Sequence, residues 1–323
     1  MKSFNSIVFP VLLAVLLASC ATAPRASLPR SDEDRELSLL PAGGSLYLWA
    51  DTAQSRPLLD VLDFGGFSGR DAAMVLDRTG TAAAVAFAQP AIEAGQEGSP
   101  EHDRRFFLAA TGRYPRHRAN FSFAFTRGWR RHRSPDGGTF WRSQNGVIAV
   151  ALGSNLALVS NIDPLEGFER VVPPRYFTEF RRGMALAGWM YSPSGPINGF
   201  LQSTGIPIQI PAEDFFFGAV RSPVSALDTS PAPWELVFRI RAPSEIHARS
   251  LLALFSTARF LFQMGAAAGD EPSPADTLSL QDAAMMLFAN VPQQDGESIT
   301  LRIGPLDENT IALLFGMFSV YSR

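Results

Sequence analysis

The second half of this chain repeats the order of features found in its first half, and this repetition constrains the fold more than any other property of the sequence. Each half contains an apolar segment ending in tryptophan, a proline before a short apolar segment, two strand-like segments, a proline before a helix-like segment, and a hairpin pattern. The matching pairs are residues 46–49 and 186–189, Pro57 and Pro196, residues 82–87 and 215–220, residues 106–110 and 236–240, Pro115 and Pro243, and the hairpins 147–160 and 299–314, the second with its turn predicted at Gly304 and Pro305. This order predicts an α+β fold of two tandem related β-α-β-β-α-β-β units, with antiparallel or mixed sheets and helices on one face.

The repeat also predicts the domain boundaries. The first unit is expected at residues 43–172 and the second at residues 183–323, joined by a linker at residues 173–182. The offset between matching features is 140 residues at the tryptophans, 128 at the second prolines and 151 at the turn glycines, a variation that insertions into a duplicated unit, or a chance similarity, would both produce. Residues 20–42 are rich in proline and acidic residues and poor in large apolar ones, so they are predicted to form a flexible tether.

Each of three prolines precedes a predicted helix. Pro57 is expected in the first turn of a helix at residues 58–62, where the missing N–H costs nothing. A helix is also predicted after Pro115, although residues 121–125 alternate as a strand would. The helix after Pro243 is expected to end near Gly265 and to pack on its own sheet, with binding to a membrane or a partner helix as the alternative. Its apolar positions recur at helical spacing: Leu251, Leu254, Phe255, Ala258, Leu261 and Phe262.

The N-terminus has the pattern of an export signal. Lys2 provides a positive charge, and residues 7–17 form an apolar run interrupted only by Pro10. This run is shorter than the roughly 20 apolar residues that a membrane-spanning helix needs. It ends in the sequence Leu17-Ala18-Ser19-Cys20.

The sequence Leu17-Ala18-Ser19-Cys20 resembles the lipobox of bacterial lipoproteins. The resemblance implies a signal peptide at residues 1–19 and a mature chain that begins at Cys20, whose thiol and amine carry fatty acyl chains such as palmitate. Two or three acyl chains anchor a protein stably in a membrane. Because Ala21 follows the cysteine, the pattern is similar to lipoproteins of the cell outer membrane that face the periplasm. The alternative is an ordinary secretory signal followed by a chance cysteine.

Composition excludes several kinds of catalysis. Cys20 is the only cysteine, so no disulfide forms within the chain, and its acylation would remove thiol chemistry. Lys2 is the only lysine, and it leaves with the signal peptide. The mature chain therefore lacks a lysine for a Schiff base, a phosphate-binding loop or a serine–lysine pair. The 25 phenylalanines predict an aromatic-rich core.

Residues 101–150 form a strongly basic block. They contain ten arginines and three acidic residues, a net charge of +7 in a chain whose total is −3. Guanidinium groups bind phosphate and carboxylate, and aromatic neighbours such as Tyr114 and Trp129 can stack on them. The candidate anion-binding residues are Arg113, Arg116, Arg118, Arg130, Arg131 and Arg133. The expected partners are an envelope protein, an anionic lipid or a glycan rather than nucleic acid, and the alternative is a solvated basic surface without a ligand.

No pattern in the sequence indicates a catalytic or metal site. The four histidines show no pair at the close spacing typical of metal ligands, so neither a metal nor a cofactor is expected. No serine lies in a G-x-S-x-G motif. The glycine-rich segment 65–69 could bind a phosphate but is more typical of a turn.

These observations predict a lipid-anchored cell-envelope protein that acts as a non-catalytic binding or scaffolding module. Two alternatives remain open. In a periplasmic carrier of lipid or another apolar ligand, phenylalanines such as those at residues 215–217 would line a cavity. In an envelope hydrolase, a dispersed catalytic site would have escaped recognition.

Overall fold

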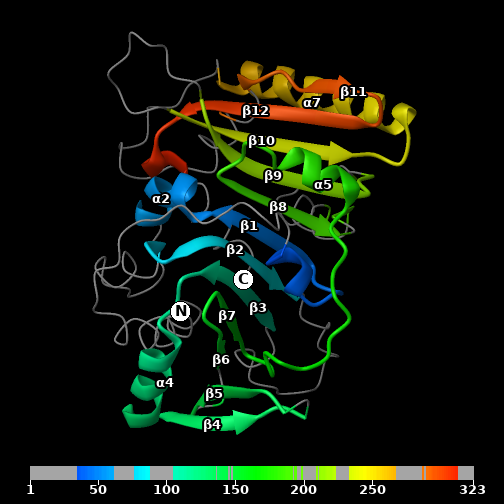
Figure 1. Cartoon of the computed structure of the whole chain (residues 1–323). Coiled ribbons are helices and arrows are strands. Elements are labelled where there is room, and N and C mark those ends of the chain that lie inside the picture. The colour runs from blue at the N-terminus through cyan, green and yellow to red at the C-terminus, as the bar shows by residue number, and fades with distance from the viewer. Residues whose placement is uncertain are drawn as a thin grey trace. The chain divides into compact units, whose positions relative to one another are not determined.

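The chain divides into two compact units, Met1–Thr178 (unit 1) and Glu179–Arg323 (unit 2). The computed structural model, drawn in Figure 1, describes residues 35–61, 76–87, 105–135, 137–144, 146, 148–191, 193–194, 198, 209, 211–222, 233–266, 286 and 289–311. The signal peptide and lipobox with Cys20, and the glycine-rich segment 65–69, lie outside these residues. The short helix α5 (Arg175–Phe180), within the predicted linker, crosses the boundary between the units.

The described part of unit 1 contains an antiparallel sheet with the order β1-β2-β3-β7-β6-β5-β4. The strands are β1 (Leu46–Asp51), β2 (Thr79–Ala86), β3 (Phe106–Gly112), β4 (Trp129–Arg133), β5 (Thr139–Ser143), β6 (Ala149–Leu152) and β7 (Leu156–Ser160). The helices are η1 (Leu37–Leu39), a 3₁₀-helix, with α2 (Thr52–Val61) and α4 (Arg116–Phe125). The helix predicted after Pro115 and the hairpin formed by β6 and β7 are confirmed.

In the described part of unit 2 the strands are also antiparallel to their neighbours, with the order β8-β9-β10-β12-β11. The strands are β8 (Leu186–Tyr191), β9 (Asp214–Arg221), β10 (Trp234–Arg241), β11 (Gln293–Asp295) and β12 (Ser298–Leu306). The helix predicted after Pro243 is α7 (Glu245–Ala266), and Ala248 and Leu251 on it pack against Ile240 and Ile299 of the sheet. Antiparallel sheets with a few helices make this an α+β fold, as the sequence predicts.

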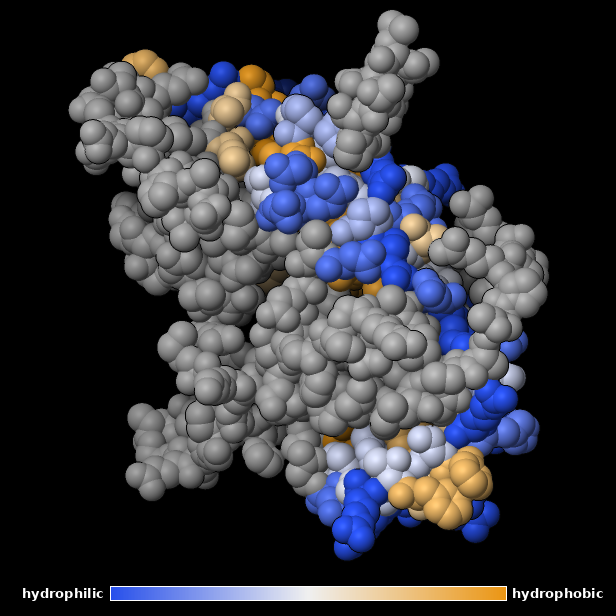
Figure 2. Space-filling model, turned by 90° about the vertical axis from the view of Figure 1, so that its left-hand side faces the viewer, coloured by the Kyte–Doolittle hydropathy of each residue, from blue (hydrophilic) through white to orange (hydrophobic). Residues whose placement is uncertain are grey.

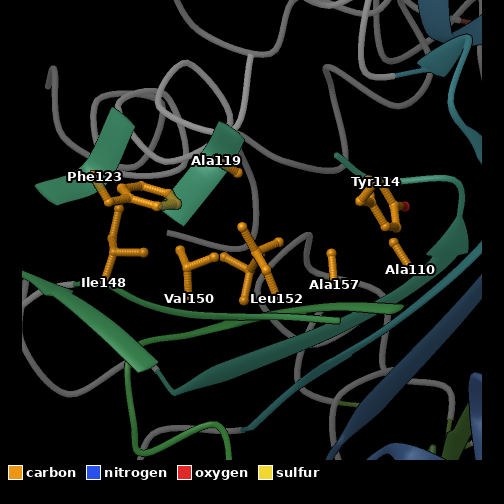
Figure 3. Packing of buried hydrophobic residues seen from close by; sticks show 9 residues of the cluster. Ala110, Tyr114, Ala119, Phe123, Ile148, Val150, Leu152 and Ala157 are labelled. Atoms are coloured by element: carbon orange, nitrogen blue, oxygen red, sulfur yellow. The ribbon is translucent and has the colours of Figure 1, made fainter. Parts of the chain in front are cut away.

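In unit 1, α4 covers one face of the sheet. Ala119 and Phe123 lie one turn apart on the buried side of this helix. Figure 3 shows them above residues of β6 and β7. The Phe123 ring lies 4.8 Å from the Trp129 ring and 5.7 Å from the Trp141 ring, measured between centroids. The residues beneath α4 include Ile148, Val150, Leu152, Ala157 and Val159.

Residues 36–42, predicted as part of the tether, are folded onto unit 1. Leu37 and Leu40 are fully buried, and the Val171 N–H donates a hydrogen bond of 2.9 Å to the Leu40 carbonyl. The burial of two leucines explains why the folded part of unit 1 begins earlier than the polar composition of residues 20–42 indicates.

In unit 2, elements cover both faces of the sheet, so the expectation of helices on one face is wrong here. Phe215 and Phe216 are neighbours on β9 and therefore point to opposite faces. Phe215 packs against the cluster that contains Leu251 of α7, whereas Phe216 stacks on Phe180 of α5 with 5.7 Å between ring centroids. A strand that is apolar on both sides requires cover on both sides.

The predicted start of the first helix is corrected by local hydrogen bonding. Helix α2 begins at Thr52, so Pro57 lies inside the helix and not in its first turn. The Asp51 carboxylate accepts hydrogen bonds from the backbone N–H groups of Ala53 and Gln54, at 3.0 and 3.1 Å. This N-terminal cap fixes the helix start five residues before the proline.

The hairpin predicted around Gly304 and Pro305 is also wrong. Both residues lie within β12, and the hairpin turn instead contains Gly296, between β11 and β12. Opposite Gly304 and Pro305, the pairing of β10 with β12 shifts, so that two residues of β12 face the single residue Glu235. This bulge allows Pro305, which has no N–H to donate to the hydrogen-bond ladder, to lie within the strand.

Candidate functional site

The structure separates the six candidate arginines into two groups. Arg113 precedes α4 and Arg116 and Arg118 lie in its first turn, whereas the other three lie on β4; all six are exposed. Helix α4 has ten residues and is therefore about 15 Å long, so it separates the groups. The sequence does not predict β4 and β5, because their arginine-rich pattern lacks the alternation of a half-buried strand.

Strand β4 divides its arginines again, between the two faces of the sheet. Residues alternate along a strand, so Arg131 and Arg133 share the face of Trp129, while Arg130 and His132 lie on the other face. Across the pairing with β5, Arg131 lies opposite Trp141 and Arg130 lies opposite Arg142. The basic block therefore forms no single arginine cluster. Arg142, which belongs to the block but not to the six candidate residues, lies beside Arg130.

The aromatic residues that accompany the arginines in sequence belong to the core. Tyr114 is buried, and its hydroxyl shares a hydrogen bond of 3.0 Å with the Thr79 hydroxyl. Burial raises the pKa of Tyr114 to about 12, and the bond to Thr79 partly opposes this shift. The indole N–H of Trp141 donates to the Asn120 side-chain oxygen over 2.9 Å. Tyr114 therefore cannot stack on a ligand as the sequence suggested.

Two other aromatic residues of α4 are exposed instead. Phe121 and Phe125 expose 67% and 73% of their surface, and their ring centroids lie 4.4 Å apart. The buried stripe of Ala119 and Phe123 turns this pair away from the sheet. Figure 2 shows exposed hydrophobic side chains bordered by hydrophilic ones at the lower end, the height at which Figure 1 places α4 and β4. The exposed residues of α4, together with Arg131 and Arg133 of β4, are called here the α4–β4 surface.

The β4 arginines have no carboxylate partner in the part of the chain that the structure describes. Within the described residues, no ion pair involves Arg130, Arg131 or Arg133, and Arg133 bonds only to the Gly137 carbonyl. Some arginines elsewhere are paired; Arg241, for example, contacts Glu213 and Asp214, each at 2.7 Å. The positive charge of β4 therefore remains available to an external anion.

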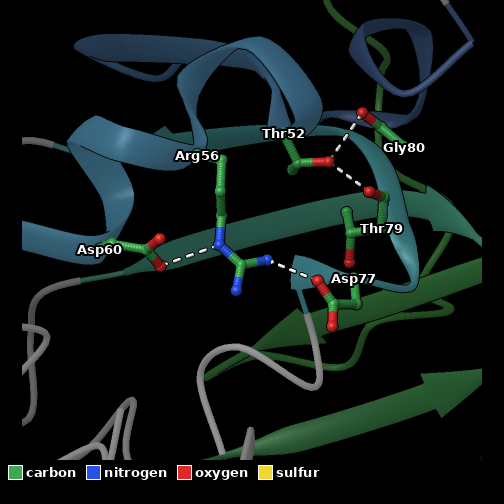
Figure 4. A network of polar contacts seen from close by, with 6 residues as sticks. All are labelled: Thr52, Arg56, Asp60, Asp77, Thr79 and Gly80. Atoms are coloured by element: carbon green, nitrogen blue, oxygen red, sulfur yellow. Dashed lines mark hydrogen bonds and ion pairs between the residues drawn. The ribbon is translucent and has the colours of Figure 1, made fainter. Parts of the chain in front are cut away.

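A second polar cluster, shown in Figure 4, has a structural role. Arg56 of α2 forms ion pairs with Asp60 and Asp77, each at 2.8 Å. The Thr52 hydroxyl donates to the Gly80 carbonyl over 2.9 Å and also contacts the Thr79 carbonyl. These contacts join α2 to the segment that leads into β2, and the charged groups satisfy one another.

The described residues offer no metal site and no catalytic triad. They contain no group of three histidine, cysteine or acidic side chains that could hold a metal ion. The Ser244 hydroxyl lies 2.8 Å from His247 Nδ1, but the Ala248 N–H bonds to the Ser244 carbonyl, so Ser244 caps α7. In the described part of the chain, no carboxylate bonds to the other nitrogen of His247. No described helix is long and apolar enough to cross a membrane.

Comparison with known proteins identifies a similar fold. No protein-family model matches the sequence, and no curated protein sequence matches it significantly. Among solved structures, the chain resembles TP0453 in crystal form IV, with a TM-score of 0.52 and 14% identity over 87% of this chain and 96% of that chain. Crystal forms III and I of TP0453 give TM-scores of 0.52 and 0.51, with 13% and 14% identity, over 93% of this chain and 100% of each. At this identity the similarity concerns the fold alone.

Proposed function

We propose that the protein is a lipid-anchored cell-envelope protein, held through Cys20 and acting as a non-catalytic binding or scaffolding module. We further propose that its α4–β4 surface contacts an anionic membrane. The observation that carries the proposal is the exposed pair Phe121 and Phe125 on α4, which covers the sheet face that also carries Arg131 and Arg133 of β4; neither arginine has an ion pair among the described residues. Aromatic rings enter the membrane interface, while arginines are attracted to anionic headgroups by about 1 kcal/mol each.

The tether supports this contact by keeping unit 1 near the bilayer. We propose that the tether predicted from the sequence runs from Cys20 and ends at about Glu36, because Glu36 is buried in unit 1. A coil of these 16 residues has a typical reach of about 22 Å. This proximity raises the effective concentration of the α4–β4 surface at the membrane, so even a weak contact becomes populated. The outer membrane is the proposed location, with the protein facing the periplasm, because Ala21 follows Cys20.

The packing of the phenylalanines favours a scaffolding module over a carrier. Phe107, Phe123, Phe177 and Phe216 are fully buried. Phe215 stacks on Phe217 at 6.0 Å between ring centroids. In the described residues these rings therefore contact other core side chains, as in a close-packed interior.

We also propose that the two units are related by tandem duplication. The orders β1-β2-β3-β7-β6 and β8-β9-β10-β12-β11 correspond strand by strand, with the β4–β5 hairpin as an addition to unit 1. Strands β1 and β8 begin 140 residues apart, and β7 and β12 begin 142 residues apart. An experimental structure of the whole chain is expected to show the same order in both units, and a different order would contradict the duplication.

The membrane contact is tested with the mature chain carrying Cys20→Ser, so that acyl chains do not contribute. Binding to phosphatidylcholine vesicles is compared with binding to vesicles that also contain phosphatidylglycerol, at low and moderate salt. Replacing Phe121 and Phe125 together with serine is expected to weaken binding about tenfold, because two rings lose their burial.

The matched control replaces two exposed apolar residues of α7, Ile246 and Phe260, with serine; they expose 74% and 59% of their surface. This variant is expected to bind as the parent does. Equal binding of the parent to neutral and anionic vesicles, or equal losses in the two double variants, would contradict the proposed contact.

A further inference from the structure

Two arginines lie directly opposite each other on β4 and β5. The register of this pair places Arg130 across from Arg142, on the face opposite Trp129, Trp141 and α4. Side chains in such positions have Cβ atoms about 4.5–5.5 Å apart, and like charges there repel each other. Proteins usually place opposite charges at these positions, but no ion pair of the described residues involves either arginine.

The surroundings of Arg142 increase the cost of this repulsion. Arg142 is partly buried, and its guanidinium carbon lies 5.7 Å from the centroid of the buried Phe140 ring. Its Nε atom is enclosed and has no hydrogen-bond acceptor in the described part of the chain. A guanidinium that is partly withdrawn from water, lacks a carboxylate and faces a second arginine is stabilised by an anion.

A histidine completes the same face. His132 is two residues from Arg130, so its side chain points to the same side of β4. Its ring stacks on the Phe140 ring with 5.6 Å between centroids, and the Phe140 ring also contacts Arg142. The face therefore carries three nitrogen-rich side chains around one buried aromatic ring, with Arg130 and His132 exposed to solvent.

We infer that Arg130, Arg142 and His132 form a binding site for a phosphate group. A carboxylate has two oxygens, which a single guanidinium fork can occupy. Phosphate has more oxygens and accepts hydrogen bonds from both forks at once, while its charge removes the repulsion between them. This inference goes beyond the proposed membrane contact, which lies on the other face with α4. A lipid headgroup or a free phosphate compound would supply the same chemistry.

The test uses the mature chain with Cys20→Ser and compares two arms. In one arm, inorganic phosphate is titrated and the unfolding temperature is followed, with acetate at equal ionic strength as the comparison. In the other arm, vesicles containing phosphatidylglycerol are titrated. Arg130→Gln and Arg142→Gln are expected to weaken phosphate binding about tenfold, the loss of one charge-assisted bidentate contact.

The matched control is Arg131→Gln, which removes one exposed charge from the same strand but from its other face. It is expected to change phosphate binding less than about threefold, because only long-range attraction is lost. Arg142→Lys serves as a second variant that keeps the charge without the fork, and it is expected to bind phosphate more weakly than the parent.

A selective loss in Arg130→Gln and Arg142→Gln supports the site, and the arm that shows the loss identifies the source of the phosphate. Equal losses in Arg130→Gln and Arg131→Gln, or no saturable binding of the parent in either arm, overturn it. The Phe121 and Phe125 double variant separates this result from the membrane contact, since it is expected to leave inorganic phosphate binding unchanged.

Discussion

Trp49 donates its indole N–H to the Glu36 carboxylate over 2.6 Å, and both side chains are buried. This bond joins the start of the folded chain to β1, beside the fully buried Leu37. Glu36 therefore lies at the start of the folded part of unit 1, within the segment that the sequence predicts as tether.

Replacing Glu36 with alanine is expected to destabilise unit 1 by about 1–3 kcal/mol, because the buried Trp49 N–H would lose this acceptor. Urea unfolding followed by tryptophan fluorescence measures the change. Trp49→Phe removes the donor, so adding Glu36→Ala to that variant should cost less than it does in the parent. Strictly additive losses would show that the bond contributes nothing to stability.

Because Tyr114 is buried, the folded state is expected to lose stability at high pH. The folded state raises the pKa of Tyr114 from 10 to about 12, so the unfolded chain loses this proton first as the pH rises. The contribution of this pKa difference to the free energy of unfolding is fully present below pH 10. It is lost between pH 10 and about pH 12, by up to about 1.4 kcal/mol per pH unit.

The measurement for Tyr114 is the unfolding free energy of Tyr114→Phe and the parent across this pH range. The variant is expected to be less stable at neutral pH, where it lacks the bond to Thr79, and to lose less stability above pH 10. Tyr176→Phe, at a position where half of the side chain is exposed, is the control. Parallel pH profiles for the parent and Tyr114→Phe would contradict the argument.

Truncating two phenylalanines of α4 should destabilise the protein to very different extents. Phe123 is fully buried between Trp129 and Trp141, so Phe123→Ala should cost about 3–5 kcal/mol of unfolding free energy. Phe121→Ala changes an exposed position two residues away and is expected to cost less than about 0.5 kcal/mol. Chemical denaturation measures the unfolding free energy of both variants. Similar losses in the two variants would mean that α4 packs in another orientation.

The sequence predicted the elements whose patterns are strong. Apolar strands such as β1 and β9 and the helix after Pro243 were recognised because their periodicity arises from burial on their own sheet. The predicted start of α2 is wrong because proline is typical of a first helical turn, whereas here the Asp51 cap starts the helix at Thr52. Pro305 was likewise interpreted as a turn, because a bulge that admits a proline depends on the partner strand β10.

The candidate site was harder to predict than the fold. The basic block was visible as composition, but the face on which each arginine lies depends on β4 being a strand. The pairing of Arg130 with Arg142 depends further on the length of the connection at residues 134–138, which sets the register. The exposure of Phe121 depends on which side of α4 meets the sheet, and Ala119 and Phe123 decide this through tertiary packing.

The last prediction concerns the anchor. Cys20→Ser is expected to move most of the protein from washed membranes to the soluble fraction, because the acyl chains supply most of the membrane affinity. The α4–β4 surface alone should retain a minor fraction at low salt, and raising the salt should release that fraction, since the Debye length falls to about 8 Å at physiological ionic strength. Restoring cysteine at this position is the control. Mass spectrometry that finds a free thiol on Cys20 of the membrane-bound protein would contradict the anchor, whatever the distribution between the fractions.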